Sequence, residues 1–259
     1  DNKIALGLIR ASGVPIAAPS ANVSGKPSPT EVSRCVEDLA GKVDFIIGGD
    51  RSRVGLESTI IDCTVMPPCV LRPGGITLEM LKEICEDVYI DPLIMEKPGD
   101  NLKPKAPGMK YRHYAPKAPV KIIDGDFQKT IAKINEMVQN YIGDKKRVGI
   151  MATDESIQCY KQGVPISLGS RKKLETVGMN LFEVLRTLDD HKVDIILSES
   201  FSEDGMGIAI MNRLKKAASY DIIKTNIEVG KGPILLDEYS DILLYRLRTM
   251  TAEQISEYM

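Results

Sequence analysis

Short apolar runs alternate with longer amphipathic segments throughout the second half of the chain. The apolar runs have the length and β-branched content of buried strands, and we expect strands at residues 120–123, 148–151, 164–168 and 193–197. The amphipathic segments carry apolar residues at helical spacing, and we expect helices at residues 127–142, 155–162, 175–190 and 207–219. Strands that alternate with helices form parallel sheets covered by helices, so this half is predicted to be a small parallel α/β domain.

The first half has a less regular pattern of shorter elements. We expect helices at residues 4–12 and 31–40, strands at 14–18, 43–47, 60–63 and 69–72, and a short helix after the cap Thr77. The last two strands flank a turn that contains Pro67 and Pro68, so they predict a hairpin.

Prolines and lysines punctuate residues 91–118, where the regular pattern stops. We therefore expect a first domain at residues 1–90, a semi-rigid linker at 91–118, a second domain at 119–224 and a helical tail of unknown role at 225–259. Within the linker, residues 107–116 combine two tyrosines, an arginine and a histidine. A passive tether does not need such side chains, so a ligand-contacting role is favoured over a plain linker.

Composition and charge narrow the class of protein. With 259 residues, 43% hydrophobic and 27% charged, the chain is expected to be a soluble globular protein with room for two domains. Its formal net charge of −2 creates no field that draws it to nucleic acid, and no apolar run has the length of a membrane-spanning helix. Five cysteines without Cys-x-x-Cys spacing indicate reduced, buried thiols in a cytoplasmic protein, and with only two histidines they predict no metal site.

A polar loop at residues 19–30 carries the clearest candidate chemistry. Its prolines restrict the backbone, so little entropy is lost when the loop holds a ligand. Four short side chains supply uncharged donors and Lys26 adds a positive charge, a combination that suits phosphate or carboxylate oxygens. The donors are Ser20, Asn22, Ser24 and Ser28. The alternative is an ordinary polar turn that caps the next helix, because turn chemistry favours the same residues.

The second half has no nucleotide-binding fingerprint. Neither Gly-x-Gly-x-x-Gly nor the P-loop pattern follows any of its expected strands. Gly205 and Gly207 open the last expected helix, where close packing is favoured over an anion site.

Four motifs, in a fixed order, resemble those of one known family. They lie at residues 18–30, 57–62, 71–76 and 107–116, and together they resemble the motifs of YrdC-like threonylcarbamoyl-AMP synthases. The fourth motif and residues 207–218 are similar to the linker and second domain of the two-domain branch. The resemblance covers residues 1–224. It implies an α/β fold, with a partial YrdC-like α/β catalytic domain followed by a linker and a small Rossmann-like parallel α/β domain.

The resemblance also implies an activity. The family is a nucleotidyltransferase, L-threonylcarbamoyladenylate synthase, that forms threonylcarbamoyl-AMP and pyrophosphate from L-threonine, bicarbonate and ATP. The product serves the modification of adenosine 37 in tRNA. ATP is then a substrate, bound with Mg²⁺, and the implied partners are a downstream threonylcarbamoyl-transferase complex and tRNA, with weak RNA binding and no membrane.

Residue roles follow from the matched motifs. The resemblance implies that the nucleotide contacts Ser20, Asn22, Ser28, Arg72 and, in the linker, Tyr111, with Arg112 and His113 nearby. It implies that Ala18 and Ser58 line a threonine pocket, and it implies no residue as acid or base. The alternatives are that Ser58 only begins a strand and that Arg72 only pairs with an acid such as Glu57.

One part of the family pattern is missing. The family's upstream Lys-x-Arg element has no counterpart in residues 1–18, so the chain resembles an N-terminally truncated member. We expect little threonine-dependent pyrophosphate release from this chain alone, because half of the pocket's positive charge is absent. Full activity in that assay would contradict the interpretation of the chain as truncated.

Two other functions compete with the enzyme. The first is a non-catalytic nucleotide- or RNA-binding module, against which the near-neutral charge argues. RNA affinity with a steep salt dependence and no ATP binding would favour it. The second is a regulatory domain fused to a carbamoyl-transfer enzyme, which the lack of zinc-finger cysteines disfavours.

Overall fold

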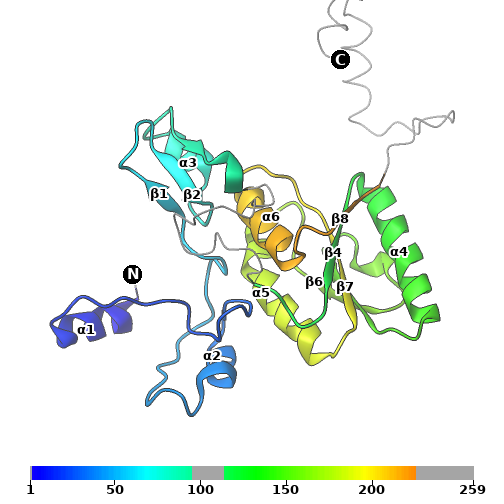
Figure 1. Cartoon of the computed structure of the whole chain (residues 1–259), viewed down its shortest axis with the longest axis horizontal. Helices are drawn as coiled ribbons and strands as arrows, with labels where there is room; N and C mark the ends of the chain where they lie inside the picture. The colour runs from blue at the N-terminus through cyan, green and yellow to red at the C-terminus, as the bar shows by residue number, and fades with distance from the viewer. Residues whose placement is uncertain (1, 95–113, 226–259) are drawn as a thin grey trace, which may run out of the picture. The chain divides into compact units, whose positions relative to one another are not determined.

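The computed structural model describes residues 2–94 and 114–225 (Figure 1). Most of the expected linker, including Tyr111, Arg112 and His113, lies outside the described residues. The tail from residue 226 onward lies outside them as well. Predictions for these segments stay predictions.

The second half forms the predicted parallel sheet. Its five strands lie in the order β6-β5-β7-β4-β8, and every neighbouring pair is parallel. The strands are β4 (Val120–Asp124), β5 (Val148–Ala152), β6 (Val164–Ser167), β7 (Ile195–Glu199) and β8 (Ile222–Lys224). Buried β-branched and leucine side chains fill the central strands, because helices cover both faces of the sheet.

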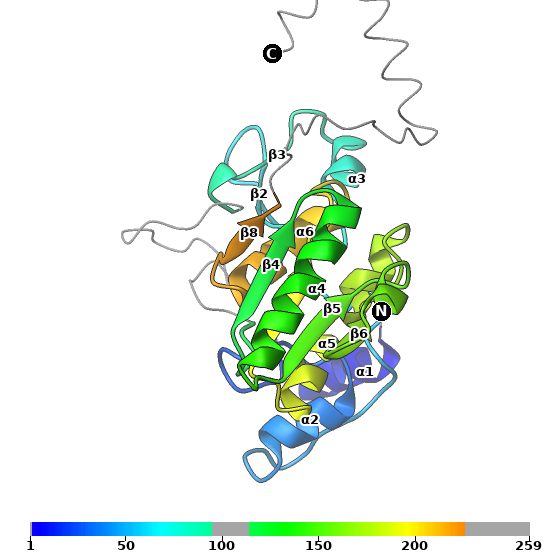
Figure 2. The same ribbon diagram turned by 90° about the vertical axis from the view of Figure 1, so that its right-hand side faces the viewer.

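Three helices cover this sheet, as Figures 1 and 2 show. α4 (Phe127–Gly143) packs on one face with Ile134 and Val138, while α5 (Leu174–Asp190) and α6 (Met206–Ala217) pack on the other. Each face of the sheet has its own hydrophobic core. The core under α5 and α6 is the larger of the two, and it includes Phe182 of α5 and Leu214 of α6. The face that carries α5 and α6 is also the one that contacts the first half of the chain.

The first half is built around a small three-stranded sheet in the order β1-β2-β3. β1 (Ile60–Asp62) and β2 (Cys69–Arg72) pair antiparallel, which confirms the predicted hairpin, and β3 (Tyr89–Ile90) joins β2 in parallel. The helices are α1 (Lys3–Ser12), α2 (Val32–Leu39) and α3 (Leu78–Lys82), and a 3₁₀ turn follows at Pro92–Ile94. The Thr77 side chain accepts from the backbone N–H of Met80 and begins α3 as predicted.

Two predicted strands are absent. Residues 14–18 and 43–47 have no regular structure, and their apolar side chains face solvent, with Ile16 47% and Phe45 89% exposed. A strand needs hydrogen bonds from a neighbouring strand, and neither segment pairs with one among the described residues. Both segments therefore have the apolar residues of a strand but lack a neighbouring strand to pair with among the described residues.

The predicted helix at 155–162 is also wrong. Only a 3₁₀ turn, Ile157–Cys159, forms there. Ser156 and Tyr160 instead donate hydrogen bonds to the buried carboxylate of Glu199 at the end of β7. These side-chain bonds hold the segment in a turn that closes over the strand end.

The cysteine prediction holds in part. All five cysteines are free, but only Cys69 is buried, while Cys63 and Cys159 are exposed. Among the described residues, no helix combines the length and the apolar character needed to span a membrane.

Candidate functional site

Four separate segments of the first half and the linker end meet at one cavity of about 730 Å³. The segments are the cavity loop, which we define as residues 18–28, the pair Glu57–Ser58, the end of the hairpin, and Tyr114. The lining residues are Ala18, Pro19, Ser20, Asn22, Ser24, Gly25, Glu57, Ser58, Ile60, Arg72 and Tyr114. The volume lies in the range of small-molecule sites.

The hairpin positions Arg72. This arginine is the last residue of β2, and its Nε donates to the Ser58 carbonyl at 2.9 Å while Nη2 donates to Ser58 Oγ at 3.3 Å. Arg72 therefore does not pair with Glu57, the alternative left open by the sequence. Among the described residues that line the cavity, it carries the only cationic side chain.

Gly74 allows the turn after β2 to pack against the site. A Cβ atom on Gly74 would collide with the backbone at Glu57, Ser58 and Thr59. Only glycine permits this close approach. The turn thus fixes the backbone that presents Ser58.

Glu57 connects the cavity to α6. Ser28 Oγ donates to Glu57 Oε1 at 2.7 Å, and Nε of the fully buried Arg213 donates to Oε2 at 3.0 Å. Burial raises the pKa of Glu57, but Arg213 and Ser28 outweigh it and hold that pKa below its usual value. Glu57 is therefore a charged, paired group at neutral pH.

Tyr114 closes one wall of the cavity. It is 2% exposed, has a φ of 64°, and stacks on Phe182 of α5 with ring centroids 5.0 Å apart. A tyrosine in the left-handed region is uncommon, so surrounding contacts must hold it there. Burial and the neighbouring Glu57 carboxylate raise the pKa of Tyr114 to about 12.

Lys216 adds a second cation on α6. It is buried, and its Nζ donates to Asn212 Oδ1 at 3.0 Å. Burial and the nearby Arg213 lower the pKa of Lys216 to about 8. Arg213 and Lys216 thus place two cationic side chains of α6 near Glu57.

The structure brings together most of the predicted site residues. Ala18, Ser20, Asn22, Ser58 and Arg72 all line the cavity. Ser28 is not among the lining residues. Its hydroxyl donates to Glu57, which does line the cavity. Tyr111 lies outside the described residues.

Asn22 and Lys26 have local roles that the sequence did not indicate. The Asn22 amide donates to the carbonyls of Val23 at 2.9 Å and Lys26 at 3.2 Å, so both of its N–H groups hold the loop together. The Lys26 ammonium pairs with Asp38 at 2.7 Å. The predicted phosphate contact of Asn22 stays a prediction.

Arg213 has no role that the sequence motifs indicated, whereas Tyr114 is one of the two tyrosines of residues 107–116, for which a ligand-contacting role was favoured. Tyr114 lies in the same motif as Tyr111, and Arg213 lies in the 207–218 motif, so both belong to segments that resemble the family. Nothing in the pattern indicates that Arg213 reaches a carboxylate 156 positions earlier.

Comparison with known proteins shows similarity over most of the chain. A family model described as "Threonylcarbamoyl-AMP synthase, C-terminal domain" matches residues 76–219, and one described as "Telomere recombination" matches residues 1–74. Threonylcarbamoyl-AMP synthase of Bacillus subtilis (strain 168) is 44% identical over 224 residues, and that of Pyrococcus abyssi (strain GE5 / Orsay) is 45% identical over 223. Each match covers 86% of this chain, and the chain spans 63% of the length of each relative.

A solved structure extends the comparison to three dimensions. The crystal structure of P. abyssi Sua5 complexed with L-threonine is 44% identical, with a TM-score of 0.79. The match covers 87% of this chain and 64% of that one. The two family models follow one another over residues 1–219, and the parallel α/β fold has the same arrangement, so the chain belongs to the threonylcarbamoyl-AMP synthase family.

Proposed function

We propose that the cavity binds ATP and L-threonine, and that the protein containing this chain forms threonylcarbamoyl-AMP and pyrophosphate from them with bicarbonate. One observation carries the proposal. Motifs that lie as far apart in sequence as Ala18 and Tyr114 meet around a single cavity of about 730 Å³.

The polar groups of the cavity suit an anionic substrate. Arg72 supplies a guanidinium, and the Ser20 and Ser24 hydroxyls supply uncharged donors beside it. The carboxylate of Glu57 is neutralised by Arg213, so it does not repel phosphate oxygens as a lone carboxylate would. Such preformed donors stabilise the charge that develops when a carbamate attacks the α-phosphate.

Positioning is the other contribution we assign to this chain. A carbamate of threonine and the α-phosphate must be held within reach of one another, and a rigid cavity replaces a collision in solution. Ala18 and Ser58 are assigned to threonine, while Ser20, Arg72 and the linker residue Tyr111 are assigned to the nucleotide. Asn22 and Ser28 are assigned to holding this arrangement as well as to the nucleotide.

The described cavity does not fit a protein-held Mg²⁺. In the part of the lining that the structure describes, Glu57 carries the only carboxylate, and its two oxygens are engaged by Ser28 and Arg213. Mg²⁺ in phosphoryl transfer is held largely by the phosphates themselves. We therefore assign any Mg²⁺ to the triphosphate and draw no step through it.

The proposal places the protein in tRNA modification. Its product would pass to a threonylcarbamoyl-transferase complex that modifies adenosine 37 of tRNA, in the cytoplasm. These partners follow from family membership and stay part of the proposal.

The direct test is titration of this chain with ATP by calorimetry. Arg72→Met should weaken ATP binding roughly tenfold, because it removes a charged donor from a half-buried position in the cavity wall. Arg51→Met is the matched control: Arg51 pairs with Glu31 and Asn180 and does not line the cavity. Equal affinity of wild type and Arg72→Met would contradict the assignment of Arg72.

Failure of the unmodified chain to bind ATP would contradict the proposed function itself. RNA binding with a steep salt dependence in that case would favour the binding module instead. The expected low rate of pyrophosphate release by the isolated chain stays a prediction, to be measured with threonine and bicarbonate present.

A further inference from the structure

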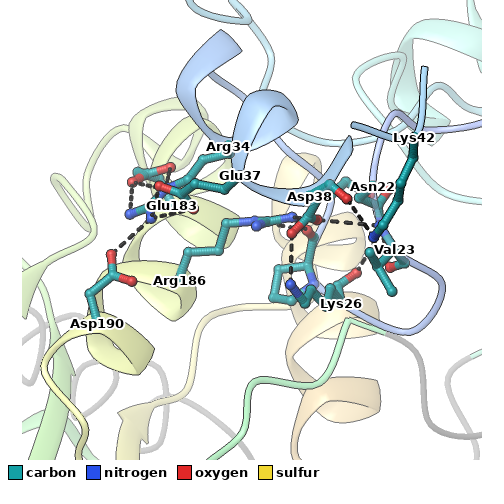
Figure 3. Close-up of polar contacts among 12 residues, drawn as sticks. Asn22, Val23, Lys26, Arg34, Glu37, Asp38, Lys42, Glu183, Arg186 and Asp190 are labelled. Atoms are coloured by element: carbon teal, nitrogen blue, oxygen red, sulfur yellow. Dashed lines mark hydrogen bonds and ion pairs between the residues drawn. The ribbon is translucent and has the colours of Figure 1, made fainter. Parts of the chain in front are cut away.

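One buried carboxylate outside the cavity lining binds two residues of the cavity loop. Asp38 of α2 is 2% exposed, and its oxygens accept from Lys26 Nζ at 2.7 Å and from the backbone N–H of Val23 at 3.3 Å (Figure 3). Two loop residues are thus tied to the same side chain. Neither Val23 nor Lys26 is among the described residues that line the cavity, whereas their neighbours Ser24 and Gly25 are.

Arg186 reaches the same group from the second domain. This arginine lies on α5, is 6% exposed, and donates from Nη2 to Asp38 at 2.8 Å. It also donates from Nε and Nη2 to the carbonyl of Pro27, at 3.0 and 2.7 Å. Arg186 therefore binds the loop directly, and it binds the carboxylate that holds the rest of the loop (Figure 3).

The planar fork of an arginine suits this arrangement. It satisfies a carbonyl and a carboxylate at once, which the single ammonium of a lysine does not reproduce. Because both side chains are buried, loss of one of them leaves an unpaired buried charge, which is strongly destabilising. We call Arg186, Asp38 and the Pro27 carbonyl the loop clamp.

A second ionic cluster joins the same two helices without touching the loop. Arg34 of α2 contacts Glu183 at 2.7 Å and Asp190 at 2.8 Å, both on α5, and Glu37 at 3.0 Å. None of the described hydrogen bonds of its side chain reaches residues 18–28. Figure 3 shows this cluster beside the loop clamp. Arg34 therefore serves docking of the helices alone.

We propose that Arg186 is a positioning residue for the ligand site: it fixes the cavity loop from the second domain, so that docking of this domain sets the affinity of the cavity for its nucleotide. The inference rests on the proposed function for its ligand. It makes the second domain part of the binding apparatus, although no residue of α5 lines the cavity.

The experiment compares Arg186→Met, Arg186→Lys and Arg34→Met in the full chain. Amide hydrogen exchange is read at Val23 and Lys26, whose N–H groups bond to Asp38 and to the Val23 carbonyl. The amide of Ile150 in the buried β5 serves as an internal reference for global unfolding. ATP affinity is measured on the same samples by calorimetry.

Arg186→Met should speed amide exchange at Val23 by about tenfold or more relative to Ile150. In this variant the loop can open without breaking the hydrogen bonds of Arg186 to Pro27 and Asp38. It should weaken ATP binding by about fivefold or more, since ordering the loop is then a cost of binding. Arg186→Lys should recover part of both effects. Arg34→Met should leave loop exchange and ATP affinity as in wild type.

Each contrary result is specific. Equal effects of Arg34→Met and Arg186→Met would show that the contact only docks the helices, which overturns the proposal. Faster loop exchange with unchanged ATP affinity would overturn the second part of the proposal, that the clamp sets the affinity for the nucleotide. If wild type binds no ATP, the proposed function fails, and the claim that the clamp sets nucleotide affinity fails with it. Amide exchange at Val23 still tests whether Arg186 fixes the loop.

Discussion

At the scale of single residues, the chemistry of the cavity depends on one carboxylate and its partners. Glu57 lies between Ser28 in the cavity loop and Arg213 on α6, and its pKa is held below the usual value by that arginine and serine against the effect of burial. The pairing permits a carboxylate to line a cavity that we propose binds the phosphates of ATP. Removal of Glu57 or of Arg213 leaves the other charge uncompensated inside the protein.

Glu57→Gln should therefore lower the free energy of unfolding by roughly 3 kcal/mol, because the fully buried Arg213 loses its counter-charge. Urea unfolding of this variant, of Arg213→Met and of the double variant gives a double-mutant cycle. The cycle should show a coupling of about 1 kcal/mol or more. Strictly additive single-variant effects would contradict a direct interaction between the two side chains.

At the scale of elements, the packing of the second domain explains residues that look like ligand motifs. Gly205 and Gly207 begin α6, and a Cβ on Gly207 would collide with the Ser202 carbonyl. The glycine is therefore required by the close approach of a loop, which agrees with the packing role that the sequence favoured. The same packing fixes the direction of α6 and with it the position of Arg213.

Gly207→Ala should destabilise the protein by about 1–3 kcal/mol, because the added methyl group has no room. Gly143→Ala, at the end of α4, is the matched control: no atom lies within 4 Å of the position that the added methyl group takes, and the helix gains a better helix former. The control should stay within about 1 kcal/mol of wild type or exceed it. Thermal unfolding of both variants is the measurement, and equal losses would contradict the packing argument.

At the scale of the whole molecule, charged contacts join the regions matched by the two family models. Asp38 with Arg186 and Glu57 with Arg213 each link a first-half residue to a helix of the parallel domain. Burial raises the pKa of Asp38, but Arg186 and Lys26 outweigh it, so that pKa is held well below its usual range. A lowered pKa makes the carboxylate stabilising above the unfolded-state value, and this stabilisation is lost as pH falls toward the folded-state value.

The difference in unfolding free energy between wild type and Asp38→Asn should therefore be constant from about pH 5 to 8 and shrink as pH falls below about 4. Urea unfolding at several pH values measures it. Glu136→Gln is the control, because that exposed carboxylate pairs only with Lys133 within α4 in the described contacts. A difference between wild type and Asp38→Asn that grows in acid would contradict the assigned sign.

Much of the site was predictable because the family motifs are short and local. Ser20, Ser58 and Arg72 were assigned from their motifs, and all three line the cavity. Ser28 does not line the cavity and its hydroxyl donates to Glu57, so its nucleotide contact stays a prediction. A motif fixes which residues are present, and it does not fix which partner each polar atom finds in the folded chain.

The amino-acid sequence by itself determined three of the four expected helices of the second half, the strands between them and the hairpin β1–β2, because hydrophobic periodicity and turn residues act over short distances. The family followed from four motifs in a fixed order, which can be read without the fold. Tertiary structure alone decided that residues 14–18 and 43–47 form no strand, since pairing requires a neighbour that local pattern cannot supply. It alone also decided that Arg186 reaches the cavity loop at Pro27 and that Arg213 reaches Glu57 of the cavity lining. Contacts across more than a hundred residues depend on how the elements pack, and no local pattern records that.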